Sequence, residues 1–263
     1  MFYALIVIYN KKIDESITYK CLKEYNQKIK IIIYDNSNDI YTEYNSKYCE
    51  INKLIYYTTY TNVGLAKAYN YVINRIEIND NNYIIMLDDD TLLNEDYFNK
   101  VFEKISLDSE SDILFPIVRS NGKIISPSNV SNKGRVKPIK KIEKLILENS
   151  TAINTATVIK TSVFKKITYN EKLFLDYVDH EFLMRIRKNN YKINLVKIQI
   201  SQNFSRFQMN DLNKELFRFK IYLKDFKIYC KECDNLLLYY LNTLKYRVHQ
   251  FFKYKSIKFL IIK

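Results

Sequence analysis

The sequence predicts an α/β protein with a mainly parallel, Rossmann-like sheet flanked by helices. In the first half of the chain, short apolar runs alternate with stretches whose apolar residues recur at helical spacing. Polar clusters follow three of the apolar runs, at Asn10, at Asp35–Asn36 and at Asp88–Asp90. Because the carboxyl ends of parallel strands meet at one edge of a sheet, we expect these clusters to share one crevice.

The expected elements of the first half follow from these patterns. Helical spacing predicts helices at residues 13–28 and 63–76. The residues that follow Thr91 fit the opening of a further helix. Uninterrupted apolar runs, typical of strands buried on both faces, predict strands at residues 2–9, 29–34, 54–58 and 83–87.

The second half is less regular. A turn at Ser120–Gly122 joins residues 113–118 and 123–125 into a predicted hairpin. The polar, basic stretch 126–148 is interpreted as a mobile loop. After that stretch, apolar patterns predict a strand, a helix and a final strand, at residues 152–159, 177–189 and 193–200.

The chain changes character at about residue 210. From Leu216 to Cys230, apolar residues recur at steps of three and four with lysines around them, which predicts a basic amphipathic helix. Residues 211–263 carry twelve Lys/Arg and five Asp/Glu, so +7 of the formal charge of +13 lies in this part of the chain. Such a segment either packs on the rest of the protein or lies on an anionic membrane surface.

The composition excludes several classes of site. The three glycines, Gly64, Gly122 and Gly134, lie too far apart for a Gly-rich phosphate loop or a dinucleotide fingerprint. Four cysteines in 263 residues do not make a disulfide scaffold, and the lone Cys230-x-x-Cys233 pair predicts buried thiols more than a zinc site. The apolar run at residues 2–9 is short for a signal peptide and for a membrane span, so we expect a cytoplasmic protein.

The apolar run Tyr83–Leu87 leads directly into Asp88, Asp89 and Asp90. Three adjacent carboxylates are costly unless a positive charge lies among them. A divalent cation is the simplest partner, because hard cations bind carboxylate oxygens. A cation at the end of a strand would be well placed to receive a diphosphate. Solvated loops and helix N-caps also accommodate aspartates, and that alternative stays open.

Four segments, with Asp88-x-Asp90 between the third and the fourth, resemble motifs of the family 2 glycosyltransferases with the GT-A fold. The resemblance covers residues 3–205 and is nearest to the bacterial rhamnosyltransferase-like branch. It implies a GT-A catalytic domain at residues 1–209, with a nucleotide-binding half (1–110) and an acceptor-side half (111–209), and a basic helical extension at residues 210–263. The four segments are Val7–Asn10, Asp35–Ser37, Asn62–Asn70 and Phe174–Arg185.

The resemblance implies a set of nucleotide-binding residues. Tyr9 and Asn10 would line the base of the nucleotide. The Asp35 carboxylate would accept a hydrogen bond from a pyrimidine N–H. Alternatively, Asp35 bonds only the backbone of its own turn. Asn62 and Gly64 would let the chain approach the nucleotide closely.

The resemblance also implies a metal site. Asp90 would ligate a Mg²⁺ or Mn²⁺ ion bound to the diphosphate of the donor, and Asp88 would contact the ribose and a water molecule on the metal. Lys67 would reach a phosphate or remain solvated. Many family members carry a metal-ligating His after the last strand, where this chain offers Gln202 or Asn203. Amide oxygens can bind these cations, but more weakly.

The fourth segment carries the implied acceptor side. Asp179 lies six residues before Arg185, as the catalytic acid of the family does, and would act as general base on the acceptor hydroxyl. Asp176 and Glu181 are the alternatives for this role, although Glu181 would face away from Asp179 on a helix. Asp176, His180, Glu181 and Arg185 are the residues expected to contact the acceptor.

We therefore predict an inverting, metal-dependent glycosyltransferase. It would move a sugar from a UDP- or dTDP-sugar, with dTDP-rhamnose as one candidate, to a hydroxyl of a glycan or lipid-linked acceptor. The pathway would be the synthesis of a cell-surface polysaccharide such as capsule or lipopolysaccharide. The basic tail would hold the enzyme at the inner face of the cell membrane. The chain has Thr155–Ala156 where the family often has Ser-Gly, and donor choice could differ for that reason.

Two other classes stay open. A sugar-phosphate nucleotidyltransferase shares a nucleotide-binding α/β sheet, but it needs a Gly-rich N-terminal loop that this sequence lacks. A basic nucleic-acid-binding protein would use the positive charge and the 24 tyrosines for phosphate contacts and base stacking. Acidic clusters at strand ends would repel phosphate, so we expect no nucleic-acid partner. Salt-dependent binding of oligonucleotides without metal would favour that class.

Overall fold

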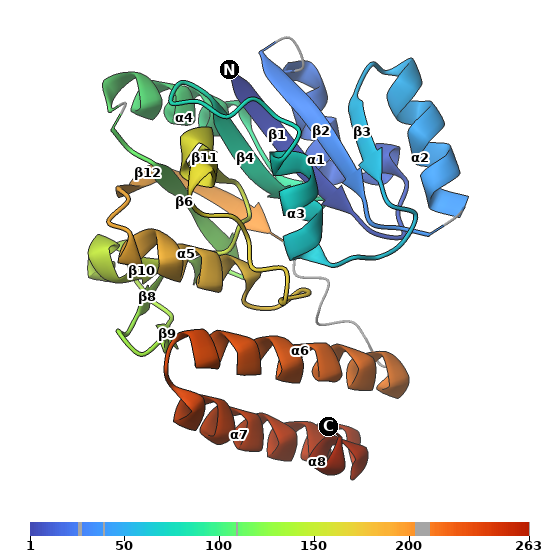
Figure 1. The fold of residues 1–263 in the computed structure, drawn as a ribbon, viewed down its shortest axis with the longest axis vertical. Helices are drawn as coiled ribbons and strands as arrows, with labels where there is room; N and C mark the ends of the chain where they lie inside the picture. Colours follow the sequence, from blue (N-terminus) through green and yellow to red (C-terminus); the bar gives the residue numbers. More distant parts are fainter. Residues whose placement is uncertain (26–27, 39, 109, 203–210, 263) are drawn as a thin grey trace.

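A computed structural model describes residues 1–25, 28–38, 40–108, 110–202 and 211–262. Its main sheet has nine strands in the order β3-β2-β1-β4-β11-β6-β12-β5, with β7 paired to β6 (Figure 1). The pairings of β1 with β2 and β4, of β2 with β3, and of β6 with β12 are parallel. β11, β5 and β7 pair antiparallel to their neighbours. The prediction of a mainly parallel sheet is therefore confirmed.

The strands of this sheet are short and mostly buried. Their bounds are β1 (Phe2–Ile8), β2 (Ile29–Asp35), β3 (Ile55–Thr58), β4 (Tyr83–Asp88), β5 (Thr91–Leu92), β6 (Ile113–Ser120), β7 (Lys123–Ser126), β11 (Thr157–Lys160) and β12 (Ile193–Gln202). The helices are α1 (Ile17–Leu22), α2 (Ile40–Ile51), α3 (Leu65–Ile73), α4 (Glu95–Leu107), α5 (Val178–Lys188), α6 (Leu212–Glu232), α7 (Leu236–Tyr254) and α8 (Lys258–Ile261).

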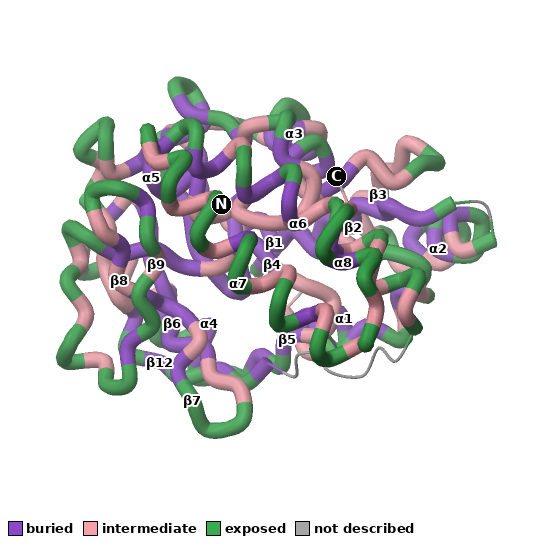
Figure 2. The backbone as a smooth tube through the Cα atoms, turned by 90° about the horizontal axis from the view of Figure 1, so that it is seen from below, coloured by how far each residue is buried: buried purple, intermediate pink, exposed green. Residues whose placement is uncertain are grey.

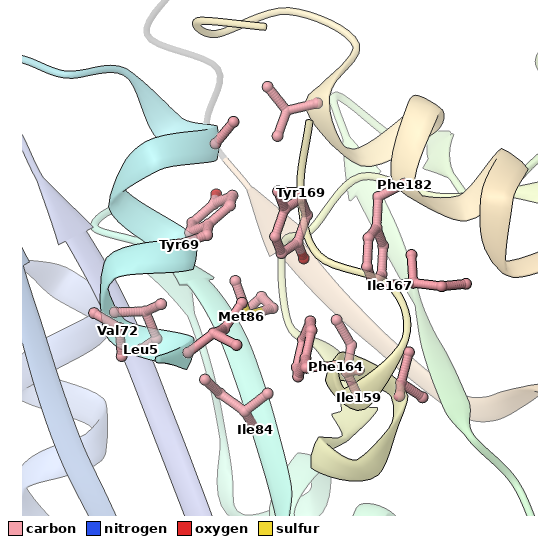
Figure 3. Packing of buried hydrophobic residues seen from close by; sticks show 14 of the residues in the cluster. Leu5, Tyr69, Val72, Ile84, Met86, Ile159, Phe164, Ile167, Tyr169 and Phe182 are labelled. Atoms are coloured by element: carbon pink, nitrogen blue, oxygen red, sulfur yellow. The ribbon is translucent and has the colours of Figure 1, made fainter. Parts of the chain in front are cut away.

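Helices cover both faces of the sheet, which explains why its strands have unbroken apolar runs. Leu5 and Met86 point to the face covered by α3 and α5. Ile6 and Leu87, the next residues along the same strands, point to the face covered by α1, α2 and α4. On the first face the rings of Tyr69, Tyr169 and Phe182 lie in a row (Figure 3). Tyr69 is tilted against Tyr169, with centroids 4.9 Å apart, and Tyr169 stacks on Phe182 at 4.4 Å. This aromatic row joins α3 to α5 across the sheet.

The predicted strands of the first half, the hairpin and the helix at 177–189 are confirmed within a few residues. The hairpin turn at Asn121 and Gly122 has positive φ at both residues, as a tight two-residue turn requires. The predicted helix at 63–76 is shorter and spans α3. The helix expected after Thr91 begins at Glu95, because Asn94 caps it by accepting a hydrogen bond from the Tyr97 N–H.

Three expectations were wrong, and one further helix, α2, was not predicted. The continuous helix at residues 13–28 is broken into a 3-10 turn (Ile13–Glu15), α1 and a second 3-10 turn (Lys23–Tyr25), because Ser16 starts a new helix as its N-cap. The strand expected at residues 152–159 begins only at Thr157, since Ala156 adopts φ 55. Helix α2, which the apolar pattern did not predict, lies between β2 and β3.

The third wrong expectation is the mobile loop at residues 126–148. This stretch contains β8 (Ser128–Val130), β9 (Val136–Lys137) and two 3-10 turns, and with β10 (Ser150–Thr151) it forms a small antiparallel sheet. Buried Val130 and Ile139 anchor it to the body of the protein. The Asn129 side chain adds hydrogen bonds to the Lys144 carbonyl and the Ile146 N–H.

The C-terminal helices form an antiparallel pair beside the α/β body (Figure 1). The predicted basic amphipathic helix is α6, and its apolar residues Phe219, Leu223 and Phe226 are buried. The sequence left open whether this helix packs on the rest of the protein or lies on a membrane surface. In the structure, α6 packs on the protein. By contrast, α7 buries only Thr243 and Gln250, and much of it is exposed (Figure 2).

Gly64 offers a test of how tightly α3 is held to the acceptor-side half. Gly64 has φ 82 and ψ 170, and a Cβ placed there would lie 2.5 Å from the Phe174 carbonyl oxygen. We expect Gly64→Ala to lower the free energy of unfolding by about 3 kcal/mol, through backbone strain and overpacking. Urea denaturation would measure this loss.

Gly122→Ala is the matched control for Gly64→Ala. Gly122 also has positive φ, 73, but no atom lies within 4 Å of a Cβ placed there. Gly122→Ala should lower the free energy of unfolding by only about 1 kcal/mol, the cost of placing an alanine in the left-handed conformation. Equal losses for the two variants would contradict a tight contact between Gly64 and Phe174.

Candidate active site

A cavity of about 430 Å³ opens at the carboxyl edge of the sheet. It lies between the ends of β4 and β12 on one side and the start of α5 on the other, and α6 closes part of it. Five residues that the sequence predicts for the site line this cavity together: Asp88, Asp176, Asp179, His180 and Gln202. Of the three strand-end clusters expected to share one crevice, only the last contributes a residue to this cavity, Asp88, which lies there with Asp179 and Gln202.

The turn that carries the three aspartates is held by the start of α1. The Ser16 hydroxyl donates to the Asp89 carbonyl at 2.8 Å, and the Thr18 hydroxyl donates to the Asp88 carbonyl at 2.5 Å. The Thr91 N–H donates to the Thr18 hydroxyl at 2.8 Å. Two short side chains of α1 therefore satisfy the backbone of the turn and leave the carboxylates to other partners.

The three carboxylates have different surroundings. Asp89 forms an ion pair with Lys11 at 2.6 Å and does not line the cavity. Asp88 Oδ2 accepts hydrogen bonds from the Thr155 hydroxyl at 2.6 Å and from Gln202 Nε2 at 3.0 Å. Gln202 Nε2 also donates to Asp90 Oδ1 at 3.2 Å. The Gln202 amide thus bridges the two carboxylates that the sequence assigns to the metal.

The carboxylates of Asp88 and Asp90 form no ion pair with a lysine or arginine among the described residues. Burial raises the pKa of Asp88 to about 6, against the hydrogen bonds from Thr155 and Gln202, and the neighbouring Asp90 raises it further. Burial also raises the pKa of Asp90. Among the described residues, Lys11 pairs with Asp89, and no lysine or arginine pairs with Asp88 or Asp90.

This donor set fits a hard divalent cation. Two carboxylates without a cationic partner offer the oxygen ligands that Mg²⁺ and Mn²⁺ prefer. Turning the Gln202 amide over would add its oxygen, since the two ends of an amide are assigned from hydrogen bonds. The described part of the chain holds no cluster of three His, Cys, Asp or Glu side chains suited to a metal, so an amide is the available third group. Asn203, the other candidate, lies outside the described residues.

Asp179 and His180 face the cavity from the first turn of α5. Tyr177, just before the helix, adopts φ 60, and this turn directs the helix start toward the cavity. Asp179 Oδ1 accepts a hydrogen bond from the His180 N–H at 2.7 Å. His180 Nδ1 lies 2.7 Å from the Thr151 hydroxyl, which fixes the ring.

Two predicted acceptor residues do not reach the cavity. Glu181 is 1% exposed, and both of its carboxylate oxygens accept hydrogen bonds from Arg185 at 2.8 Å. Arg185 also donates to the Thr168 carbonyl. Because Glu181 lies two residues after Asp179 on a helix, it points to another side, and the geometry gives this pair a structural role.

The predicted nucleotide-binding segments are joined to one another at the strand ends. The Asn10 N–H donates to the Ser37 hydroxyl at 2.6 Å, and Asn36 Oδ1 accepts from the Val63 N–H at 2.9 Å. Asn62 Oδ1 accepts from the Gly64 N–H at 3.0 Å and shapes the start of α3. Beside this connected edge, the Tyr9 side chain is 53% exposed, and Lys67 is exposed on α3.

Asp35 differs from the other members of this set because it is fully buried. Its Oδ1 accepts a hydrogen bond from the Ser37 N–H at 2.9 Å. Its Oδ2 accepts from Asn45 Nδ2 at 2.7 Å and from the Tyr56 hydroxyl at 3.0 Å. These contacts support the alternative that Asp35 holds its own turn, and a contact with a base stays a prediction.

The sequence did not predict the contribution of α6 to the cavity. Arg218 and Tyr222 of α6 line it, and both guanidinium Nη atoms of Arg218 contact the Asp176 carboxylate, one at 2.6 Å. The available signal was a charged residue next to Phe219, one of the apolar residues of the predicted amphipathic helix. The partner of that charge could not be read from a pattern within the helix.

The comparisons with known proteins agree on one family, the glycosyltransferases of family 2. The family model described as "Glycosyl transferase family 2" matches residues 3–168. A protein of Methanocaldococcus jannaschii, named an uncharacterized glycosyltransferase, is 26% identical over 197 residues, which cover 72% of this chain and 63% of that protein. The dTDP-rhamnosyl transferase RfbF of Shigella flexneri is 28% identical over 191 residues, which cover 70% of this chain and 62% of that protein.

A solved structure supports the fold. The crystal structure of GalNAc-T7 with UDP, GalNAc and Mn²⁺ superposes with a TM-score of 0.57 at 14% identity, over 77% of this chain and 43% of that one. The prediction of a GT-A fold is confirmed by this likeness and by the family match. The matches span less than two thirds of the length of each of the two sequence relatives.

The raised pKa of Asp88 leads to a prediction for the metal-free protein. Because the folded-state pKa of about 6 exceeds the unfolded value, the stability that Asp88 contributes is present below about pH 4 and is lost as the pH rises through about 6. Asp88→Asn removes the charge and keeps an acceptor oxygen. We expect this variant to be more stable than the unaltered protein by about 2 kcal/mol at pH 8, and equally stable near pH 4, in urea denaturation with chelator.

Asp89→Asn provides the control for this pH dependence. It removes the partly exposed ion pair with Lys11, so we expect a loss of at most about 1 kcal/mol at pH 8. A stabilising effect of the Asp89 variant, or a destabilising effect of the Asp88 variant at pH 8, would contradict an uncompensated charge at Asp88.

Proposed function

The chain belongs to glycosyl transferase family 2, and from this premise we propose that it is an inverting glycosyltransferase that uses a nucleotide-sugar donor. The observation that carries the proposal is the single cavity that Asp88 and Asp179 line together. Asp88 is predicted to lie beside the metal and the diphosphate of the donor, and Asp179 is the predicted base. An inverting transfer needs these two functions on opposite sides of one sugar.

Asp88, Asp90 and Gln202 are the residues proposed to hold a divalent cation. Their uncompensated charge and their oxygen ligands support this assignment, and GalNAc-T7 was crystallised with Mn²⁺. A cation bound there would neutralise the charge that develops on the leaving nucleoside diphosphate. Thr155 holds the Asp88 carboxylate in place through its hydroxyl.

Asp179 is the proposed general base. Its carboxylate would take the proton from the acceptor hydroxyl, whose oxygen attacks the anomeric carbon from the face opposite the leaving group. The bond from the anomeric carbon to the diphosphate oxygen breaks, and its electron pair stays with the diphosphate. The configuration at the anomeric carbon is thereby inverted. His180 would contact the acceptor from its place beside Asp179.

The nucleoside part of the donor is proposed to lie at the edge formed by the ends of β1 and β2 and the start of α3. Tyr9, Asn10, Asn62 and Gly64 would line it, and Lys67 would reach a phosphate. UDP- and dTDP-sugars are the proposed donors. The likeness to a dTDP-rhamnosyl transferase supports dTDP-rhamnose as a candidate. The acceptor is proposed to be a growing cell-surface glycan on a lipid carrier.

The structure describes no helix whose length and apolar character would suffice to span a membrane. Helix α7 nevertheless turns its apolar side outward: Leu237, Leu241 and Leu244 are 60–68% exposed and form one stripe along the helix. The opposite side, which faces α6, carries Tyr246 and the buried Thr243 and Gln250. Leu238, Tyr239 and Tyr254 also pack on the neighbouring helices, so α7 has apolar residues on both sides and only one of these sides is covered.

The occupant that fits this apolar stripe is an anionic lipid surface. Residues 235–263 carry six Lys/Arg and no Asp or Glu. A second copy of the chain would bring an equal positive charge to the same place, whereas anionic headgroups would complement it. We therefore propose peripheral binding at the inner face of the cell membrane, where lipid-linked acceptors are located.

The assignment of the base is tested by Asp179→Asn. Without the carboxylate the acceptor hydroxyl is not deprotonated, and we expect kcat for sugar transfer to fall by about 10²–10⁴-fold. Nucleotide affinity, measured by calorimetry with UDP and dTDP in the presence of Mn²⁺, should stay the same because Asp179 belongs to the acceptor side. Asp96→Asn, an exposed position on α4, serves as control. Normal turnover by the Asp179 variant would end this assignment.

Membrane binding is tested on α7 with the double variant Leu241→Asp, Leu244→Asp. We expect sedimentation with phosphatidylglycerol-containing vesicles to weaken by about tenfold or more, because apolar area is lost and negative charge is added. Transfer to a water-soluble acceptor should be unchanged. Leu107→Asp makes the same kind of change at a residue 78% exposed on α4. Equal losses in the α7 and α4 variants, or equal binding to uncharged phosphatidylcholine vesicles, would refute the proposed surface.

A further inference from the structure

Helix α6 holds the backbone of the segment that leads into the catalytic helix. Asp225 lies in the middle of α6 and is fully buried. Its carboxylate accepts hydrogen bonds from three successive backbone N–H groups, those of Phe174 at 3.1 Å, Leu175 at 2.8 Å and Asp176 at 2.9 Å. Three converging N–H groups make a small anion-binding concavity, and Asp225 fills it.

Side chains of α6 hold the same segment. Arg218, two helical turns before Asp225, contacts the Asp176 carboxylate with both Nη atoms. The Tyr177 ring stacks on Phe226 and Tyr229, with ring centroids 4.7 and 4.8 Å apart. Backbone and side chains of residues 174–177 are therefore bound by a single helix.

The opposite side of this segment touches the donor-binding half. The Phe174 carbonyl accepts a hydrogen bond from the Leu65 N–H at 2.6 Å, at the first residue of α3. Asp179 follows Tyr177 by two residues. The segment thus lies between α3 and α6, and its position sets where the carboxylate of Asp179 meets the cavity.

Packing alone does not explain a buried aspartate in α6. Burial raises the pKa of Asp225, and the three backbone hydrogen bonds oppose that rise, so the carboxyl group is buried at a desolvation cost. An apolar side chain would avoid that cost but would leave three partly buried N–H groups without this partner. Among the described residues, the Asp225 carboxylate is the hydrogen-bond acceptor for the N–H groups of residues 174–176, which precede α5.

We infer that α6 is part of the active site and that Asp225 and Arg218 are positioning residues that fix Asp179 relative to the donor. Asp225 does so through the backbone of residues 174–176. Arg218 does so through Asp176, whose negative charge it also neutralises inside the cavity. Asp176 is thereby less available as a base, which leaves that role to Asp179. The inference rests on the proposed function, because it concerns the placement of the proposed base.

The test compares Asp225→Ala, Arg218→Met and Arg218→Lys in the full chain. For the first two we expect kcat to fall by about 10²-fold, because a base displaced by about 1 Å is no longer aligned with its proton. The dissociation constant for UDP or dTDP with Mn²⁺ should change by less than about twofold, since the donor-side contacts are untouched. Arg218→Lys keeps the charge without the planar fork and should recover part of kcat.

Lys224→Ala, an exposed position on the same helix next to Asp225, is the control and should keep full activity. If Asp225→Ala does not fold, Arg218→Met still tests the inference, because it leaves the contacts of Asp225 in place. Folded variants with unchanged kcat, or nucleotide affinity that falls in step with kcat, would overturn the inference alone. Absence of transfer by the unaltered protein with every nucleotide-sugar would overturn the proposed function, and this inference with it.

Discussion

The structure is organised around the burial of negative charge at the end of β4. A strand buried on both faces delivers three adjacent carboxylates to the edge of the sheet, and each must find a partner. Lys11 forms an ion pair with Asp89, while the Thr155 hydroxyl and the Gln202 amide donate hydrogen bonds to Asp88. These hydrogen bonds reduce the cost of burying Asp88 but do not cancel its charge, since its pKa remains raised to about 6. This unbalanced negative charge supports the proposed cation site, through which the diphosphate of a donor would be bound.

Much of the fold followed from local patterns, because the strands are buried on both faces and the turns carry their own chemistry. The failures have identifiable causes. Ser16 breaks a helical pattern because its hydroxyl caps α1 and also binds the Asp89 carbonyl, a contact 73 residues away in sequence. Residues 126–148 look like a solvated loop in composition, yet Val130 and Ile139 are buried and organise a second small sheet. Long-range contacts decided both cases.

In the candidate site, too, some residues were predictable from local patterns and others depended on long-range contacts. Asp88, Asp179 and Gln202 were predictable because each lies in a segment with a recognisable motif or at the end of a strand. Arg218 and Asp225 were not, since their partners lie some 40 to 50 residues away and α6 reads locally as a basic amphipathic helix. A charged residue on the buried face of such a helix indicates a partner without naming it. The predicted boundary at residue 210 stays a prediction, but α6 on its far side lines the cavity.

The inward and outward faces of the C-terminal helices bear on how an acceptor would arrive. Helix α6 divides its apolar residues between two neighbours. Phe226 and Tyr229 pack on the α/β body, whereas Phe219 and Leu223 pack against residues of α7 and α8, among them Tyr246 and Phe259. Leu237, Leu241 and Leu244 of α7 lie on the side away from these contacts and are exposed. Packed helices lie about 8–10 Å apart. If α7 rests on a lipid surface, the wall of the cavity that α6 provides stands one helix layer above it. A sugar acceptor carried on a membrane lipid would then need to rise only a short distance to reach Asp179, and a long soluble glycan would gain nothing from this arrangement.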